Sequence, residues 1–470
     1  MRTRTLVVDG PQDVDAYMDA TPIATRRHRS IIVLGFAGIA FESYFVGSVS
    51  AGIGSLTKQL DLSAGEVGFI TAFGYFGAIL LAAFGGRFAD RFGRVPLMVF
   101  AKFLAAAGVV VMMLARNYET LVFGRLLTGA AYGIDLGVAM AYLAEFLPTK
   151  RKSLLNYWQA QWYVSTVLAL AATLLFYAVD TGPNLWRWGL GSAAVFALVV
   201  GVLQLRLPES PRWLAQQGRF TDAARSLGRV YGVEADVSGA SNDASARPGT
   251  DKARLKDLFA PEHRARTLLS ATVQATQSIQ YYAIGFYLPI IALTLFGESF
   301  PMATTGALVM NLFGVVGGVL SIWLAARYGF RRTVLTCYSL IIGALLVLGV
   351  FIDGLHVVLA VIVPAVFLLA QSAGPGGAGL TMTALAYPTE LRARGGQFGT
   401  MVKAGGAVVG LFTFPLLREG PGTSWAILIF ALAPVLGLIV TAAIRWEPMR
   451  APGSRAASPD DADPALASGH

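Results

Sequence analysis

About twelve strongly apolar stretches, each long enough to cross a lipid bilayer as a helix, are spread along this 470-residue chain. Hydrophobic residues make up 55% of the sequence and charged residues only 14%, a composition that soluble domains do not have. The sequence therefore predicts an all-α integral membrane protein with twelve transmembrane helices. The expected spans are 30–56, 67–86, 95–115, 120–146, 156–179 and 186–205 in the first half, and 267–296, 302–326, 333–351, 356–387, 395–417 and 424–444 in the second.

A basic segment between the second and third spans has an incomplete copy in the second half. The segment at 86–94 reads GRFADRFGR and the copy at 326–332 reads ARYGFRR, so their turn glycines, Gly93 and Gly329, are 329 − 93 = 236 residues apart. A second related pair, Glu145 and Glu390, is 390 − 145 = 245 residues apart. Both separations are about half the chain, which predicts two pseudo-symmetric six-helix bundles.

The repeat and the spans together give a predicted domain organisation. It comprises an N-terminal segment at 1–29, a first bundle at 30–206, a central loop at 207–266, a second bundle at 267–445 and a disordered tail at 446–470. In the central loop, Ser210 is expected to cap a short helix that begins at Pro211. The stretch 239–249 contains no apolar residue larger than alanine and is expected to be a flexible linker.

The formal charge of +9 does not indicate nucleic-acid binding, because the basic residues recur at every second loop and do not form one patch. Arginine and lysine beside membrane spans hold those loops in the cytoplasm. Both termini are therefore expected to be cytoplasmic, in a multi-pass protein of a bacterial plasma (inner) membrane. The first span is the expected targeting signal, since no cleavable signal peptide precedes it.

Three motifs resemble the major facilitator superfamily of membrane transporters. They are the segment at 86–94, the motif PESPR at 208–212 after the sixth span, and Gly124-Arg125 followed by a glycine series and Glu145 in the fourth span. The second and third resemble sugar porters and organic-acid or metabolite:proton symporters. The resemblance implies two six-helix bundles that rock about a central binding site.

The sequence also departs from the sugar-porter pattern. Trp446-Glu447-Pro448 stands where sugar porters usually have a Pro-Glu-Thr-type motif, and Ala326 stands where Asp90 stands in the first copy. These departures weigh against a sugar substrate.

The resemblance assigns the charged loop residues and their turn glycines to a gate on the cytoplasmic face. Charge pairs there would hold that face shut and break when it opens. The alternative is that the arginines only determine which loops lie in the cytoplasm. The expected gating residues are Gly86, Asp90, Arg91, Gly93, Arg94, Glu145, Glu209, Arg212, Arg327, Glu390 and Arg392.

Four ionisable residues inside predicted spans are the candidates for function, because a charge there costs roughly 2.5 to 3.5 kcal/mol even on insertion scales. Glu42, in Phe41-Glu42-Ser43-Tyr44-Phe45, resembles the first-helix acid of aromatic-acid/proton symporters. A carboxyl in a partly dry cavity can bind and release a proton near neutral pH. Arg125 is a candidate partner of Glu42, and Asp135 resembles the fourth-helix acid of phosphate and metabolite symporters. Asp135 lies two residues past Gly133, on another helical face, and is expected to look into the cavity. Glu42, Asp135 and Arg125 are the predicted proton-coupling residues, with structural ion pairing as the alternative.

Lys403, in the eleventh span, is followed by Ala404-Gly405-Gly406, where organic-acid transporters often have an arginine and small residues. A fixed cation there would offset a substrate carboxylate brought out of water. Alternatively, Lys403 is a partner for Glu42 or Asp135 and makes no contact with substrate.

Polar residues on the seventh span are expected to line the solute site. Gln274, Gln277 and Tyr281 share one helical face, which resembles the glutamine-rich seventh helix with which sugar porters bind hydroxyl groups. Helix–helix hydrogen bonding is the alternative. Gln159, Asn311 and Gln371 are further candidates.

The sequence does not indicate an enzyme, because it has no paired Cys or His metal motif and no Gly-x-x-x-x-Gly-Lys phosphate loop. No cofactor and no metal are expected.

The predicted function is proton-coupled symport of a small organic solute, with an anionic metabolite such as an aromatic or aliphatic carboxylate favoured. The alternatives are a sugar or polyol symporter, a proton-driven exporter of drugs or secondary metabolites, and a transporter-like solute sensor. The expected partners are the solute, protons and the lipid bilayer, with the monomer as functional unit.

Overall fold

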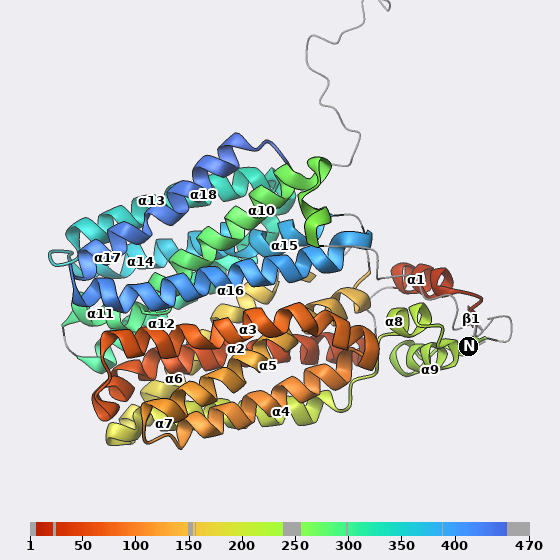
Figure 1. Ribbon diagram of the computed structural model, residues 1–470, viewed down its shortest axis with the longest axis horizontal. Coiled ribbons are helices and arrows are strands. Elements are labelled where there is room, and N and C mark those ends of the chain that lie inside the picture. The colour runs from red at the N-terminus through yellow and green to blue at the C-terminus, as the bar shows by residue number, and fades with distance from the viewer. Residues whose placement is uncertain are drawn as a thin grey trace, which may run out of the picture.

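The computed structural model describes residues 6–21, 25–148, 154–155, 157–237, 255–297, 299–387 and 389–448. The side chains at 83–87, 90, 255, 384, 389–390 and 392–393 are outside this description. The chain forms two helical bundles that lie side by side with their long helices roughly parallel (Figure 1). The first half contains α2 (Arg26–Leu60), α3 (Ala64–Phe92), α4 (Arg94–Met113), α5 (Tyr118–Phe146), α6 (Tyr157–Ala178), η2 (Gly182–Asn184) and α7 (Leu185–Gln204). The second half contains α10 (Pro261–Gln280), η4 (Tyr281–Gly285), α11 (Leu288–Phe296), α12 (Phe300–Tyr328), α13 (Phe330–Phe351), α14 (Val357–Gln371), η5 (Ser372–Gly376), α15 (Gly377–Leu385), α16 (Thr389–Glu419), α17 (Thr423–Phe430) and α18 (Leu432–Ala443).

Eleven helices are long and apolar enough to cross a membrane, or up to twelve if one bent pair counts as a span, among the residues described. The bent pair is the seventh span, in which α10 and α11 meet at 45°. The π-helical segment η4 lies at this bend, and π-bulges are common at functional sites. The tenth span is also interrupted, because η5 is π-helical and contains Pro375. The Gly374-Pro375-Gly376-Gly377 sequence thus coincides with a break in the regular α-helix.

Glycines on α5 allow close approach to α3. A Cβ atom added at Gly129 would lie 1.9 Å from the backbone oxygen of Gly74, and one at Gly133 would lie 2.6 Å from that of Ala78. The four-residue spacing of Gly129, Gly133 and Gly137 in the sequence predicts a flat stripe for close helix packing, and the first two glycines form it. The prediction is wrong for Gly137, because a Cβ atom added there would have no neighbour within 4 Å.

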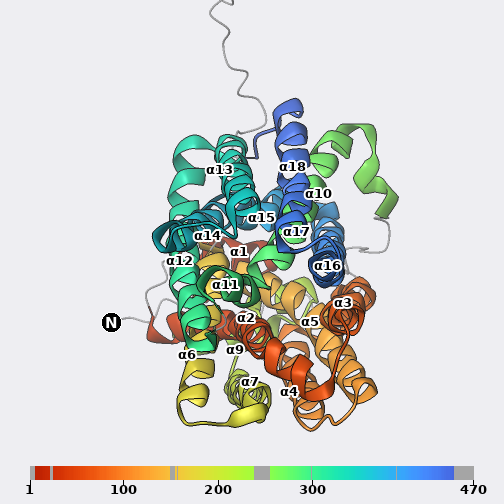
Figure 2. The ribbon, with the colours of Figure 1, turned by 90° about the vertical axis from the view of Figure 1, so that its left-hand side faces the viewer.

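The two halves contact one another mainly through α3 with α16 and α6 with α12, as the view along the bundles shows (Figure 2). Glycines again allow the approach. A Cβ atom at Gly318 of α12 would lie 2.5 Å from the backbone of Ala160 on α6, and one at Gly68 of α3 would lie 2.7 Å from the backbone oxygen of Phe412 on α16. Any relative movement of the halves must therefore open or slide backbone-to-backbone contacts.

The internal repeat has a structural counterpart at the starts of α4 and α13. Gly93 precedes α4 with φ +101°, and Gly329 precedes α13 with φ +83°. A glutamate then caps each helix: Glu209 accepts a hydrogen bond from the backbone N–H of Val95 (3.2 Å), and Glu447 accepts from those of Phe330 (3.0 Å) and Arg331 (2.9 Å). A carboxylate at a helix N-terminus also complements the helix dipole. Glu447 thus does for the second half what Glu209 does for the first, despite the missing Pro-Glu-Thr motif.

The N-terminal segment and the central loop pack together at one end of the first bundle, which we call the arginine-rich end (right in Figure 1). This assembly consists of β1 (Leu6–Val7), α1 (Pro11–Ala20), α8 (Pro211–Gln216), α9 (Phe220–Tyr231) and β2 (Ala235–Asp236). Strands β1 and β2 pair in parallel. Arg212 of α8 forms ion pairs with Asp15 (3.4 Å) and Asp19 (2.7 Å) of α1. Ser210 caps α8 as predicted, because its side chain accepts from the N–H of Trp213.

Two regional predictions fall outside the residues described. The expected flexible linker at 239–249 lies within 238–254, and all but the first three residues of the expected disordered tail lie within 449–470.

Candidate functional site

A pocket inside the first half brings together the first predicted coupling residues. It is lined by Glu42 and Phe45 of α2, Gly74 and Tyr75 of α3, and Arg125, Thr128, Gly129 and Tyr132 of α5. Gly74 leaves room for the long side chain of Arg125, since a Cβ atom at Gly74 would lie 3.0 Å from its guanidinium. The pocket therefore combines one acid and one base with tyrosine rings.

Glu42 and Arg125 line this pocket without forming an ion pair. The Arg125 guanidinium instead donates hydrogen bonds to the backbone oxygens of Ile70 (3.0 Å) and Thr71 (2.7 Å) and lies over the Phe45 ring at 5.3 Å. No hydrogen bond or ion pair joins the Glu42 carboxyl to any residue that the structure describes. Its electrostatic neighbours are Arg125, Lys102, Lys403 and Asp135. The carboxyl is thus held in a charged surrounding while its oxygens stay available to a proton.

Asp135 forms a buried ion pair with Lys102 of α4, a residue that our sequence reasoning missed. Lys102 is 1% exposed and Asp135 is 6% exposed. A Cβ atom at Gly38 of α2 would lie 3.5 Å from the Lys102 nitrogen, so the glycine leaves room for the ammonium group. Lys102 lies in the predicted third span, and an ionisable residue in a span was the signal that should have identified it. Asp135 therefore does not lie free in a cavity, as its helical face suggested.

Lys403 lies among aromatic rings from the other half of the protein. Its ammonium nitrogen is 4.9 Å from the ring centre of Trp158, 5.0 Å from that of Trp162 and 6.0 Å from that of Tyr132. No ion pair or hydrogen bond joins this ammonium to Glu42, Asp135 or any other described residue, although Glu42 is one of its electrostatic neighbours. Aromatic faces attract a cation, so these rings hold the ammonium in place.

The glutamines of the second half form a buried hydrogen-bonded chain. Gln280 donates to Gln371 (2.6 Å), Gln371 donates to Gln277 (3.0 Å), and Gln277 donates to Gln274 (3.4 Å). The amide nitrogen of Gln274 and the amide oxygen of Gln280 have no protein partner among the residues described. The hydrogen-bonded glutamines thus join α10 to α14, and two of their amide atoms remain without a partner among the residues described.

The remaining predicted lining residues are divided between the site and helix packing. The Tyr281 hydroxyl accepts from the indole of Trp162 across the two halves (2.6 Å). Gln159 is buried beside η5, where a Cβ atom at Gly376 would lie 2.9 Å from its amide nitrogen. Asn311 donates to the backbone oxygen of Ala307 on its own helix (2.8 Å), which uses part of its capacity locally.

Aromatic residues that the sequence did not single out join the halves around this centre. Tyr75 donates to Tyr282 (2.9 Å), and Thr71 is hydrogen-bonded to Tyr287 (3.0 Å). Their pairing could not be read from the sequence, because each contact joins residues more than 100 positions apart.

At the arginine-rich end, several predicted gating residues contact one another within the first half. Arg94 forms an ion pair with Glu145 (3.2 Å), and a Cβ atom at Gly93 would lie 2.4 Å from an Oε of Glu209. Arg91 lies over the ring of Phe92 at 5.4 Å.

The other predicted gating residues have different contacts or lie outside the description. Arg327 lies 5.7 Å from the ring centres of both Trp323 and Tyr328. Arg212 binds α1, as described above. The side chains of Asp90, Glu390 and Arg392, and the position of Gly86, are outside the described part.

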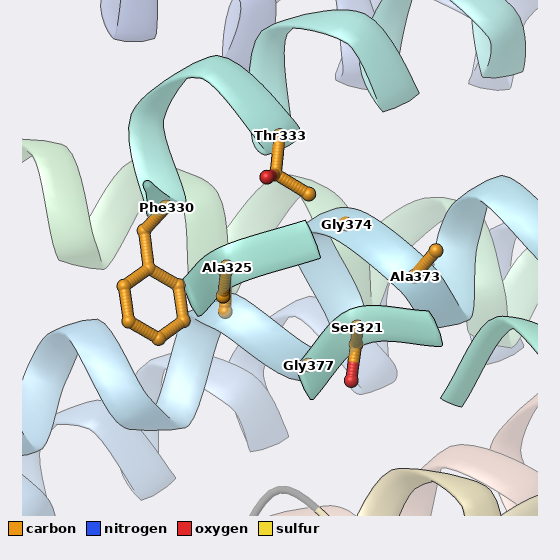
Figure 3. Close-up of a pocket in the computed structure, with 8 residues that line it drawn as sticks. Ser321, Ala325, Phe330, Thr333, Ala373, Gly374 and Gly377 are labelled. Atoms are coloured by element: carbon orange, nitrogen blue, oxygen red, sulfur yellow. The ribbon is translucent and has the colours of Figure 1, made fainter. Parts of the chain in front are cut away.

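A second small pocket lies within the second half, between α12, α13, η5 and α15 (Figure 3). It is lined by Ser321, Ala325, Phe330, Thr333, Ala373, Gly374, Gly377 and Ala378, so its polar atoms are limited to hydroxyls and backbone. The view shows Phe330 and Thr333 of α13 facing the small residues of η5 and α15. No group of three His, Cys, Asp or Glu residues that could hold a metal occurs among the residues described. The Glu42, Lys403 and glutamine region therefore remains the candidate site.

Comparison with known proteins gives the family. The family model described as "Sugar (and other) transporter" matches residues 31–447. The inner membrane metabolite transport protein YgcS of Escherichia coli is 29% identical over 425 residues, which are 90% of this chain and 92% of that protein. The arabinose-proton symporter of Bacillus subtilis is 24% identical, covering 86% of this chain and 88% of that protein.

Solved structures support the same fold. The xylose transporter XylE from E. coli, in a partially occluded inward open conformation, matches with a TM-score of 0.73 at 18% identity, covering 90% of this chain and 99% of that chain. The chain is thus a multi-pass membrane protein with the major facilitator fold, and not an enzyme. It belongs to the sugar (and other) transporter family.

Proposed function

We propose that this protein is a proton-coupled symporter of a small polyhydroxylated solute, which works by alternating access. The observation that carries the proposal is the pairing, in one central region, of a carboxyl without a hydrogen-bond partner and a chain of glutamines with unused amide atoms. A proton and a hydroxylated solute are the ligands that these two features suit. The relatives support this choice, since they include an arabinose-proton symporter and a proton:xylose symporter.

Glu42 is the proposed proton carrier. Three cations, Arg125, Lys102 and Lys403, and one acid, Asp135, are the charged neighbours of its carboxyl. A movement of α3 or α5 changes these distances, so the affinity of Glu42 for a proton changes with conformation. Arg125 is the proposed local partner, and the Asp135–Lys102 pair is the proposed relay toward the arginine-rich end.

The glutamines are the proposed hydroxyl-binding groups. Gln274, Gln277 and Gln371 offer amide donors and acceptors on α10 and at the end of α14, beside the π-helical interruptions of both spans. Tyr281, Gln159 and Asn311 complete the proposed lining. Sugars and polyols fit this chemistry better than the aromatic or aliphatic carboxylates that the sequence favoured, because those acids have few hydroxyls for the amides to bind.

The gate and the orientation follow from the charged end of the bundles. We propose that the arginine-rich end faces the cytoplasm, with both termini there, in a bacterial inner membrane. The Arg94–Glu145 pair and the glutamate caps Glu209 and Glu447 are proposed to hold this face together, as parts of a gate that includes Asp90, Glu390 and Arg392. The monomer is the proposed functional unit.

The experiment that tests the proposal is solute accumulation in proteoliposomes under a pH gradient. A gradient of one pH unit corresponds to about 1.36 kcal/mol, so one coupled proton supports roughly tenfold accumulation. Glu42→Gln is expected to lose accumulation and to retain exchange of labelled for unlabelled solute, because exchange needs no net proton movement. Glu119→Gln, at an exposed position of α5, is the matched control and is expected to accumulate normally. Full accumulation by Glu42→Gln would refute the proposal.

A further inference from the structure

We infer that the solute is a sugar acid, whose carboxylate pairs with Lys403 while its hydroxyls bind the glutamines. The inference rests on the proposed function and narrows its substrate class. It is drawn from the charge and contacts of the region around Lys403.

Lys403 is a buried cation that forms no ion pair with an acid of the described residues, although Glu42 is near enough to attract it. Its side chain is 4% exposed, and no oxygen of the described residues accepts a hydrogen bond from its ammonium group. Burying a charge without a hydrogen-bonded counter-charge is unfavourable. The rings of Trp158, Trp162 and Tyr132 offset part of that cost. The site would therefore gain from an anion that arrives from outside.

The charges in the core do not balance. Three cations, Lys102, Arg125 and Lys403, lie deep in the bundles with two acids, Glu42 and Asp135, so the sum is 3 − 2 = +1. Lys102 is already bonded to Asp135, and Arg125 shares the Glu42 pocket. The excess charge is thus on Lys403. A proton on Glu42 would raise the sum to +2, and a bound monoanion returns it to +1, the value of the empty carrier.

Unused hydrogen-bond donors and acceptors lie on α6, which contacts the Lys403 ammonium, and on α10, which packs against the helix of Lys403. The indole nitrogen of Trp158, whose side chain lies against the ammonium, has no partner within the described residues and is 3% exposed. The amide oxygen of Gln159 and the amide nitrogen of Gln274 are also without partners there. An ammonium and an indole N–H are both donors, which suits a carboxylate. The amides offer both donor and acceptor groups, which suits hydroxyls.

Lys403 also lies between the two parts of the proposed site. Tyr132 contacts its ammonium and lines the Glu42 pocket, whereas Trp162 contacts its ammonium and donates to Tyr281 next to the glutamines. The backbone oxygen of Lys403 accepts a hydrogen bond from Ser278 of α10 (2.6 Å), which fixes α16 against the glutamine helix. A carboxylate at Lys403 therefore places the rest of a short polyol chain within the glutamine region.

The test compares sugar acids with their neutral counterparts on the purified full-length protein. Gluconate, galactonate, glucuronate and galacturonate are each measured beside the matching aldose or alditol, by thermal stabilisation and by equilibrium binding. We expect at least one acid to bind roughly tenfold or more tightly than its neutral counterpart. Hexanoate, an acid without hydroxyls, is expected to bind more weakly than that sugar acid.

Variants separate the role of the charge from the fold. Lys403→Gln is expected to weaken acid binding by roughly 10- to 100-fold, the range of one charge-assisted hydrogen bond, and to leave neutral sugars unchanged. Lys403→Arg keeps a cation and is expected to retain the acid preference. Lys58→Gln removes an exposed lysine near the end of α2 and is the matched control.

The inference is overturned if no acid in the panel binds more tightly than its neutral counterpart, a comparison that needs no variant. It is also overturned if Lys403→Gln folds and keeps the preference. Failure of the proposed function is a different result: acids bind through Lys403, but no pH gradient drives their accumulation. That result would support the proposed substrate class and refute the proposed proton coupling.

Discussion

The buried pair between Lys102 and Asp135 allows a quantitative prediction. Asp135→Asn keeps the size of the side chain and removes its charge, which leaves the Lys102 ammonium without a counter-charge. Lys102 is 1% exposed, so water cannot replace the carboxylate without a rearrangement of the helices. Breaking such a pair from one side destabilises proteins by about 3–5 kcal/mol. We expect Asp135→Asn to fall in this range.

Contacts that remain in Asp135→Asn should place its loss of stability in the lower part of that range. The Phe41 ring, 5.8 Å from the ammonium, retains a favourable contact, and an asparagine oxygen can still accept one neutral hydrogen bond. The double variant Lys102→Met with Asp135→Leu removes both charges and fills a similar volume. It is expected to be within about 1–2 kcal/mol of the wild type, because well-packed apolar pairs often replace buried ion pairs without loss.

The assay is equilibrium unfolding in mixed detergent micelles, followed by tryptophan fluorescence and helix content. A double-mutant cycle compares the wild type, Lys102→Met, Asp135→Leu and the double variant, and its coupling energy is expected to be at least about 2 kcal/mol. The reasoning is refuted if Asp135→Asn has the same free energy of unfolding as the wild type, or if the effects of Lys102→Met and Asp135→Leu sum to the effect of the double variant. Transport by the double variant then tells whether the pair relays protons: if it still accumulates solute normally, the pair is structural only.

The remaining predictions concern the helix caps, the contact between halves and the N-terminal assembly. Glu447→Gln removes the carboxylate that caps α13, and should lower the free energy of unfolding by about 1–2 kcal/mol in the same unfolding assay. An unchanged value would show that the cap is dispensable. Gly318→Leu inserts a side chain where a Cβ atom already lies 2.5 Å from Ala160, and should reduce solute exchange in proteoliposomes at least roughly tenfold. Normal exchange would mean that α6 and α12 need not meet. Arg212→Ala removes the ion pairs to α1 and should increase limited proteolysis at 11–20, with a change in stability within about 1 kcal/mol.

Most of the fold could be predicted from the sequence, because a lipid bilayer requires long apolar helices and hydropathy marks them directly. The span predicted at 95–115 is α4, Arg94–Met113, and the span predicted at 333–351 is α13, Phe330–Phe351. The glycine repeat also identified the two helix starts at which Glu209 and Glu447 act. The β1–β2 pair and α1 were not predicted, since their contacts join residues that are far apart in the sequence, such as Asp19 with Arg212 and Leu6 with Ala235.

The sequence identified many residues of the candidate site, but it did not predict which of them contact one another. Glu42, Lys403 and the glutamines stood out as polar groups in apolar spans, a signal that composition alone provides. Which of them meet depends on the rotation and depth of each helix, and one-dimensional periodicity does not determine either. For this reason Asp135 was matched with a cavity and not with Lys102, and the aromatic surroundings of Lys403 were not foreseen.

The measurement that tests the central claim most directly is solute-driven proton movement. Proteoliposomes with a trapped pH indicator receive solute without any imposed gradient, and the internal pH is followed. The account predicts acidification of the lumen when a transported solute is added, no acidification with Glu42→Gln, and solute entry in the same vesicles. Entry of solute into wild-type vesicles with no change in internal pH would contradict proton symport and leave a facilitator.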